Sequence, residues 1–160
     1  MTAPPASTSS PGMRWFPDEM PVPALGPESA GWWEEAAAHR LVVQRCADCG
    51  RTRHPPGPLC PACRSRASTW STLPGTGTVY TYTVVHQAFI PALSDTVPYV
   101  VAVVELDGGD GARLVSDIVD VHPEDVAVGM AVAVVWEDMG PDLALPRFRA
   151  VTTVGTGGAP

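Results

Sequence analysis

The sequence contains no lysine, few cysteines and no long apolar run. All ten basic side chains are therefore arginines, set against seventeen acidic ones. No apolar stretch approaches the ~18 residues that a membrane-spanning helix needs. The first residues, MTAPPASTSSPG, have neither the basic start nor the apolar core of a secretion signal. These absences predict a cytoplasmic protein with no membrane partner.

The formal net charge of −7 is distributed unevenly along the chain. Six arginines and one acid, Asp48, lie between Arg40 and Arg66, so this segment is basic while the rest is strongly acidic. An acidic chain lacks the positive surface that binding to a phosphate backbone requires. We therefore expect no nucleic-acid partner. The basic segment itself is a candidate site for a smaller anion, because the guanidinium group matches phosphate geometry.

All four cysteines lie within one stretch, CADCGRTRHPPGPLCPACR, with the spacing C-x₂-C-x₁₀-C-x₂-C. Two such pairs in Gly- and Pro-rich turns can bring four thiolates around one tetrahedral cation. A disulfide is disfavoured in a reducing compartment, and nothing else in the sequence suggests electron transfer by iron. We therefore predict a structural zinc ion bound by Cys46, Cys49, Cys60 and Cys63. Four protein ligands leave no coordination position for a substrate, so the metal should not be catalytic.

Composition divides the chain into five segments. Residues 1–27 are rich in proline and are expected to form an extended tail, and residues 28–40 should form a helix. Residues 41–73 hold the cysteines and form a module too small to fold without a metal. Residues 74–154 are rich in valine and are predicted to form a barrel, followed by a short tail at 155–160.

The helix is expected to begin after Ser29 as its N-cap and to end near two basic residues, His39 and Arg40. Trp33, Ala36 and Ala37 should share one face, and Trp32 and Trp33 should pack the helix either onto its own protein or onto a partner. Two strands, 41–45 and 68–73, flank the cysteines. Five further runs have strand character: 78–87, 99–106, 112–119, 131–138 and 147–154. Period-two alternation in the first of these places the side chains of Tyr80, Tyr82, Val84 and His86 opposite those of Val79, Thr81, Thr83 and Val85. Five strands with one helical turn at HPEDVAVGM fit a small Greek-key barrel.

In their order along the chain, QRCADCG, CPAC, GTVYTYTVVH, PYVVAVVEL, RLVSDIV and PEDVAVGMAVAVVWED resemble the DUF35 family, the zinc-ribbon and OB-fold proteins that accompany acyl-CoA thiolases. The resemblance covers roughly residues 14 to 150 and rests on the ordered set, because either module alone occurs in unrelated proteins. It implies a mainly β fold: an N-terminal helix, a rubredoxin-like zinc ribbon and a five-stranded OB-fold barrel. The four cysteines match the family's metal positions one by one.

The resemblance also implies a function. Such a chain would be a non-catalytic accessory subunit that binds a thiolase-like enzyme and helps to form or stabilise its acyl-CoA site. Complexes of this kind in steroid side-chain degradation resemble retro-aldolases that cleave a β-hydroxyacyl-CoA. With acyl-CoA as the ligand of the complex, Arg51 and Arg53 are the residues we expect near the coenzyme A phosphates. No hydratase segment accompanies the resemblance, so enoyl-CoA hydration is not expected of this chain.

Two other functions remain open from the residues alone. A zinc ribbon joined to an OB-fold also suits single-stranded nucleic acid, with Tyr80 and Tyr82 as stacking faces. A stand-alone acyl-CoA thioesterase would have to use the acid–base candidates near strand ends, which are His86, Asp95, Asp117 and His122. The loop QAFIPALSDTVPY around Phe89 is apolar enough either to pack on the barrel or to dock a partner, and the sequence does not choose between these. LDGGDG lacks the ligand spacing of a calcium loop and is expected to be a hairpin turn.

Overall fold

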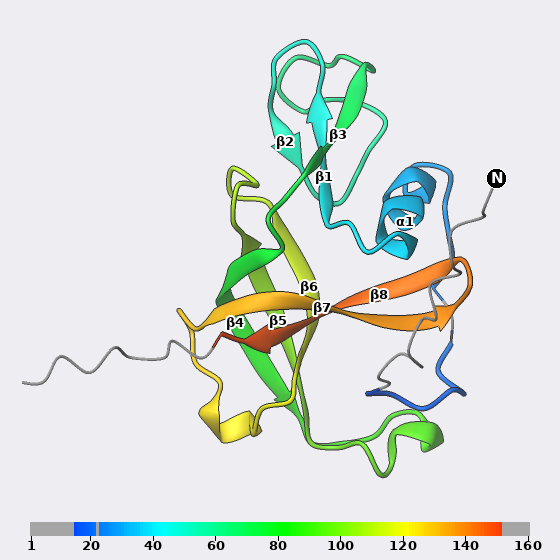
Figure 1. Cartoon of the computed structure of the whole chain (residues 1–160), viewed down its shortest axis with the longest axis vertical. Helices are drawn as coiled ribbons and strands as arrows, with labels where there is room; N and C mark the ends of the chain where they lie inside the picture. The colour runs from blue at the N-terminus through cyan, green and yellow to red at the C-terminus, as the bar shows by residue number, and fades with distance from the viewer. Residues whose placement is uncertain (1–14, 22, 152–160) are drawn as a thin grey trace, which may run out of the picture.

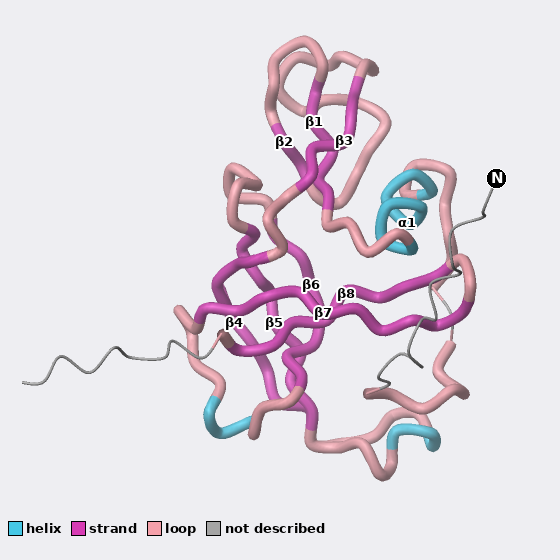
Figure 2. Tube along the Cα trace, in the orientation of Figure 1, coloured by secondary structure: helices cyan, strands magenta, loops and turns pink. Residues whose placement is uncertain are grey.

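A computed structural model describes residues 15–21 and 23–151 (Figures 1 and 2). Most of the predicted N-terminal tail and all of the C-terminal one lie outside these ranges. The described chain is mainly β, as the sequence predicts, with one α-helix, a small sheet and a barrel. In chain order its elements are α1 (Ala30–Ala37), β1 (Val42–Cys46), β2 (Thr52–Arg53), β3 (Ser68–Thr72), β4 (Thr76–Val85), η1 (Pro91–Leu93), β5 (Tyr99–Leu106), β6 (Arg113–Val119), η2 (Pro123–Asp125), β7 (Ala131–Gly140) and β8 (Leu143–Ala150).

The first module is a three-stranded antiparallel sheet in the order β2-β1-β3. β1 pairs with β3 along its full length, from Val42 opposite Thr72 to Cys46 opposite Ser68. At the inner end the Leu73 amide donates to the Leu41 carbonyl at 2.8 Å, so the chain enters and leaves the module at one point. The cysteine loops lie at the opposite end, at the top of Figure 1, away from the barrel.

The second module is a closed five-stranded barrel in the order β4-β5-β6-β8-β7. All neighbouring pairs are antiparallel except β6 and β8, whose short parallel contact at Ile118 and Phe148 closes the barrel. β-Branched side chains fill its interior, because their stiff χ1 suits the pleated surface. The most deeply buried are Val79, Val100, Val104, Val132 and Phe148. η2 forms the expected helical turn before β7.

A β-bulge in β4 changes which side chains face inward. Val79 pairs with Val104, but the next pair is Thr81 with Val103, so Tyr80 is the extra residue. The predicted strict alternation is therefore wrong, because a bulge shifts the phase of all later residues. After it, Tyr82 and Val84 lie opposite the buried Ala102 and Val100 and share the inner face with Val79.

The helix is shorter than expected, and Ala36 is the one residue of the predicted face that is fully buried. Trp32 and Ala36 are buried, whereas Trp33 and Ala37 are only partly covered. The Trp32 indole explains this choice, since its Nε1 donates to the Val42 carbonyl at 3.0 Å. Ser29 occupies the N-cap position, but its hydroxyl donates back to the Gly26 carbonyl and does not cap a helical N–H. The two predicted basic residues lie beyond the last turn.

The last strand also differs from its expected position. β8 runs from Leu143 to Ala150 instead of 147–154, and its Pro146 lies opposite Trp136 in β7. Proline has no N–H to give to a ladder and is therefore unusual inside a strand. The Pro146 carbonyl accepts a hydrogen bond from the Ser116 hydroxyl at 2.5 Å, which ties β8 to β6 at this position.

Contacts between side chains hold the first module and the helix against the barrel. The Thr52 hydroxyl donates to the carbonyl of Gly109, at the tip of a barrel hairpin, at 2.7 Å. Beyond the helix, the His39 ring stacks on Trp136 with centroids 5.4 Å apart, and its Nε2 lies 2.7 Å from an Asp138 carboxylate oxygen. The first module therefore contacts the barrel at a hairpin tip, and the residue that follows the helix contacts it at β7.

The segment that precedes the helix crosses the barrel surface. Phe16 is buried, packs edge-on against Tyr99 with ring centroids 5.4 Å apart, and lies beneath the guanidinium of Arg147. The segment that precedes the helix thus packs on its own protein at this point. In the parts of the chain that the structure describes, no helix is long and apolar enough to cross a membrane.

Candidate functional site: a four-cysteine centre and an adjoining cavity

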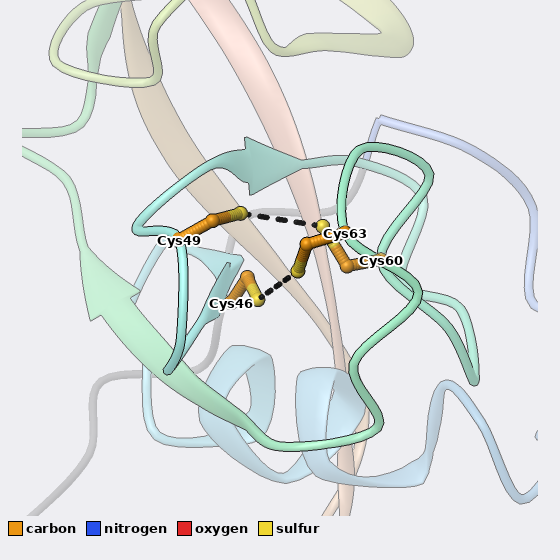
Figure 3. A group of neighbouring side chains, drawn as sticks. All are labelled: Cys46, Cys49, Cys60 and Cys63. Carbon is orange, nitrogen blue, oxygen red and sulfur yellow. Dashed lines mark hydrogen bonds between the residues drawn. The ribbon is translucent and has the colours of Figure 1, made fainter.

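The four cysteines converge at the outer end of the first module (Figure 3). Their sulfur atoms all lie within 4.8 Å of one another, with 3.5 Å between the Sγ atoms of Cys46 and Cys63 and 3.5 Å between those of Cys49 and Cys60. A tetrahedral zinc site with bonds of about 2.3 Å separates its sulfurs by roughly 3.8 Å. The donor set and its spacing therefore fit a zinc ion with four thiolate ligands, and the cysteines are positioned to bind a metal.

Backbone amides around the sulfurs favour the thiolate form that metal binding needs. The N–H groups of Cys63 and Ala62 lower the pKa of Cys60 to about 6. The N–H of Cys49 likewise lowers the pKa of Cys46. Hydrogen bonds to the charged form stabilise it, as in other low-pKa thiols. These amides come from the turns themselves, so the C-x-x-C spacing supplies both ligands and donors.

The two cysteine turns repeat one backbone pattern. After Cys49 the Gly50 amide donates to the Cys46 carbonyl at 3.0 Å, and after Cys63 the Arg64 amide donates to the Cys60 carbonyl at 2.8 Å. Gly50 has φ +74 and Arg64 has φ +63, so both turns close through a left-handed residue. Glycine adopts this conformation at little cost, whereas arginine carries a Cβ penalty there.

The two arginines expected near coenzyme A have different surroundings. Arg51 is exposed. Arg53 is partly buried, and its Nη2 donates to the Gly57 carbonyl at 2.9 Å. Its Nε and Nη1 are buried and meet no acceptor among the described residues. Buried guanidinium donors without partners are costly, which makes this group a candidate for binding an anion.

A cavity of about 370 Å³ lies where the helix, the first module and the barrel meet. Apolar side chains dominate its walls, with an imidazole and a guanidinium among them. Its volume is in the range of small-molecule sites. Neither Arg51 nor Arg53 lines it, although the next residue, His54, does. The lining includes Trp32 and Trp33 of α1, His54, Pro55 and Pro56 of the cysteine module, and Leu114, Val115, Leu145 and Arg147 of the barrel.

His54 is neutral in this wall at physiological pH. Burial lowers the pKa of its imidazole to about 4, because the charged form loses hydration there. Its ring lies against the Trp32 indole with centroids 5.4 Å apart. The imidazole therefore offers the cavity a neutral ring rather than a cation.

The cation in the cavity wall is Arg147, which the sequence analysis did not single out. Its Nε donates to Glu137 at 2.8 Å, its Nη1 pairs with Asp117, and it stacks over Phe16. Burial raises the pKa of Asp117, although the guanidinium beside it acts in the opposite direction. The alternation of arginines in the run RFR was the one sequence signal that could have indicated Arg147. The partners lie at least ten residues away in sequence, so only the closed barrel brings them together.

The remaining sequence candidates lie elsewhere. His86 and His122 line one groove at the lower end of the barrel, and Asp117 is held by Arg147 as described above. Phe89 is 82% exposed while Leu93 of the same loop is 4% exposed, so the loop both packs on the barrel and presents an aromatic ring. Tyr80 is half exposed, with the Arg113 guanidinium 3.5 Å above its ring.

Comparison with protein families gives two adjoining matches. Residues 33–69 match the ChsH2 rubredoxin-like zinc ribbon domain, and residues 70–137 match the ChsH2 C-terminal OB-fold domain. Both agree with the observed small sheet and closed barrel. The first match also supports zinc as the metal of the four-cysteine centre.

Curated relatives have two kinds of name. A "Probable enoyl-CoA hydratase alpha subunit" of Thermomonospora curvata is 47% identical over 81% of this chain. The "3-oxo-4,17-pregnadiene-20-carboxyl-CoA hydratase alpha subunit" of Mycobacterium tuberculosis is 36% identical over 81% of it. The chain spans only 39% and 40% of the lengths of these two proteins. A "DUF35 domain-containing scaffold protein" of Methanocaldococcus jannaschii is 38% identical over 69% of this chain and 77% of its own length.

Among solved structures, a chain of the "Ltp2-ChsH2(DUF35) aldolase" superposes with a TM-score of 0.73 at 45% identity. The match covers 81% of this chain and 98% of the other, so both modules and their arrangement are shared. Together with the scaffold relative, this similarity places the present chain in a family of known fold. The chain belongs to the DUF35 family of zinc-ribbon and OB-fold proteins.

Proposed function

We propose that this chain is a non-catalytic accessory subunit that binds a thiolase-like enzyme and helps to form or stabilise its acyl-CoA site. The complex would act as a retro-aldolase on a β-hydroxyacyl-CoA of steroid side-chain degradation. The observation that carries this proposal is the match to the chain from the "Ltp2-ChsH2(DUF35) aldolase", 98% of which is covered at 45% identity. The pregnadiene-carboxyl-CoA name of one relative supports the substrate class.

The geometry supports an accessory role in two ways. Four cysteine ligands would complete a tetrahedral zinc site, so the ion would stabilise the ribbon and would have no position left to activate a substrate. Asp117, the most buried of the acid–base candidates, is engaged by Arg147 rather than placed beside a nucleophile. The reacting groups would therefore come from the partner enzyme.

Binding can be tested by mixing the purified chain with a thiolase-like enzyme encoded in the same genome. We expect the two to elute together by size-exclusion chromatography with light scattering. We also expect cleavage of a β-hydroxyacyl-CoA only when both are present. Two results would overturn the proposal: separate elution with equal turnover in the presence and absence of the chain, or hydrolysis of acyl-CoA by the chain alone, which would favour a thioesterase.

Within this proposal, Arg51 and Arg53 contact the coenzyme A phosphates. The two unpartnered donors of Arg53 and the exposure of Arg51 support this assignment. Arg51→Ala and Arg53→Ala should each weaken binding of a coenzyme A ester to the assembled complex by about tenfold, the cost of a charge-assisted hydrogen bond. Arg66→Ala, which removes another exposed arginine of the ribbon, is the control. Equal affinities for all four proteins would remove these residues from the site.

The domain limits and the location belong to the same proposal. We place the ribbon at 41–73 and the barrel at 74–154, with the break at the Pro-Gly stretch between β3 and β4. Four free cysteines arranged as metal ligands fit a reducing compartment such as the cytoplasm.

A further inference from the structure

The second half of β4 is an open edge of the barrel. β4 pairs with β5 as far as Val85, but with β7 only from Thr76 to Thr78. On the β7 side, the backbone N–H and carbonyl of Val79 still bond to Met130 and Gly129. Beyond Val79, no backbone hydrogen bond from the described parts of the chain reaches that side of β4. This edge therefore presents N–H and carbonyl groups that are available to another strand.

A groove of about 520 Å³ adjoins this edge. Tyr82, Val84 and His86 form one wall, and the η2 turn with His122 and Glu124 contributes another. Figure 1 shows η2 at the lower end of the barrel, where β4 ends. The bulge at Tyr80 creates this wall, because it turns Tyr82 and Val84 to the inner face beyond the point where β7 has separated from β4.

The edge lacks most features that prevent pairing with other chains. Natural edge strands are usually protected by charged side chains, prolines or an inward-pointing lysine. The run from Thr81 to Val85 contains none of these. The bulge precedes this run and does not interrupt it. A strand with an open backbone edge, neutral side chains and an adjoining groove has the properties of a peptide acceptor.

We propose that this edge binds an extended polypeptide segment of another protein as an additional β-strand beside β4. The backbone of the segment pairs with the open N–H and carbonyl groups, and alternate apolar side chains enter the groove beside Tyr82 and Val84. A basic residue at the end near η2 matches the exposed Glu124 and Asp125. The segment is otherwise uncharged. Its recognition depends on extended backbone and not on the zinc ribbon or the cavity beside the helix.

The probe is a displayed library of random short peptides selected on the whole zinc-loaded chain. We expect the selected peptides to alternate apolar and polar residues, and to show backbone NOEs to residues 82–84 in the isotope-labelled protein. Tyr82→Lys and Val84→Lys place a charge in the groove and should each weaken binding by about tenfold or more. Thr83→Lys adds the same charge to the same strand on the outer face, so it should leave affinity within about twofold.

The following results would contradict the proposal. Failure to select any peptide, or bound peptides that are helical or lack contacts with β4, would overturn it. Equal loss of affinity in Thr83→Lys and Val84→Lys would indicate packing on the outer face instead of strand addition. A dimer by light scattering whose exchange-protected amides map to β4 would assign the edge to a second copy of this chain. Thermal melts of Tyr82→Lys, Val84→Lys and Thr83→Lys show whether the barrel is intact. Tyr82 is 36% exposed, so its replacement should disturb the barrel less than that of the more buried Val84.

Discussion

Glu137 and Arg147 form an ion pair inside the barrel wall, with 2.8 Å between Oε2 and Nε. The Glu137 side chain is 0% exposed, and its other oxygen accepts the backbone N–H groups of Trp15 and Phe16. Every direction around this carboxylate is therefore occupied by a donor that folding must bring there.

Replacing Glu137 should cost much more stability than replacing an exposed acid. Glu137→Gln removes one of the two carboxylates that pair with Arg147 and places an amide N–H₂ or carbonyl beside donors that now bind a carboxylate. We expect the free energy of unfolding to fall by about 3 kcal/mol, as for other broken buried pairs. The control is Glu105→Gln, because its pair with Arg113 is largely exposed and should be worth no more than about 1 kcal/mol. Equal losses in chemical denaturation would contradict the role we assign to burial.

Loss of one cysteine ligand should release the metal and unfold the ribbon. Cys60 is buried, so Cys60→Ser leaves an incomplete site in the interior of the small module. We expect one zinc ion per wild-type chain and about none in the variant by elemental analysis. Amide exchange should then become fast in β1 and β3, because a module of this size has too little core of its own. A control change at exposed Arg66, to alanine, should retain zinc; retention in Cys60→Ser as well would refute the site.

A side chain at Gly50 should destabilise the first cysteine turn. Gly50→Ala places a Cβ on a residue with φ +74, at a cost of about 1–2 kcal/mol. Gly57→Ala is the matched control in the same loop, because its added Cβ would meet nothing within 4 Å and no positive φ is involved. The melting temperatures of the two zinc-loaded variants are compared by thermal denaturation. A lower melting temperature for Gly57→Ala than for Gly50→Ala would contradict the expected strain at Gly50.

His54 should make the fold weaken as the solution becomes acidic. Its pKa is about 4 in the folded chain against 6.5 for an ordinary histidine, so the unfolded chain takes up the proton first. The contribution of the neutral His54 imidazole to the stability of the fold is complete above pH 6.5 and is lost as pH falls toward 4. Between pH 7 and pH 5 the free energy of unfolding should fall by about 2 kcal/mol because of this group.

The measurement is the difference in unfolding free energy between wild type and His54→Gln at each pH, with zinc in excess. The shared contributions of Asp117 and the cysteines cancel in that difference. If the difference in unfolding free energy between wild type and His54→Gln does not change between pH 7 and pH 5, the imidazole is not buried in its neutral form.

Phe89 offers a separate test of partner binding. Its ring is 82% exposed, so Phe89→Asp should leave the melting temperature nearly unchanged. If the loop docks on the thiolase-like enzyme, the change should weaken co-elution by about tenfold, the order expected of an interface aromatic. Leu93→Asp is the contrasting variant, because Leu93 is buried and its replacement should unfold the loop. Undiminished co-elution of Phe89→Asp would remove this loop from the interface.

Local patterns predicted the fold class and the grouping of the four cysteines. The cysteine spacing fixes two short turns, and the valine-rich runs give strands whose bounds differ from the structure by a few residues. The family resemblance is confirmed by the comparisons. The zinc ligands and the coenzyme A contacts stay predictions.

What the sequence could not show depends on pairing between distant segments. The bulge at Tyr80 is a property of the pairing between β4 and β5, which are separate runs in the sequence, so strict alternation failed there. β8 begins at Leu143, ahead of the predicted run, because its pairing with β7 extends across Pro146. Trp32 rather than Trp33 is buried because Val42 offers its indole an acceptor. Arg147 was missed for the same reason, since its partners come from β6 and β7.

The stack of His39 on Trp136 and the Thr52 bond to Gly109 have a consequence for any guest molecule. They hold the helix and the ribbon against the barrel, so we expect the cavity between Trp33 and Leu145 to keep its shape when it is empty. A ligand would then bind only if its own shape fits this cavity. Binding should therefore be selective for ligand shape, and ligands of many different sizes should not be accepted.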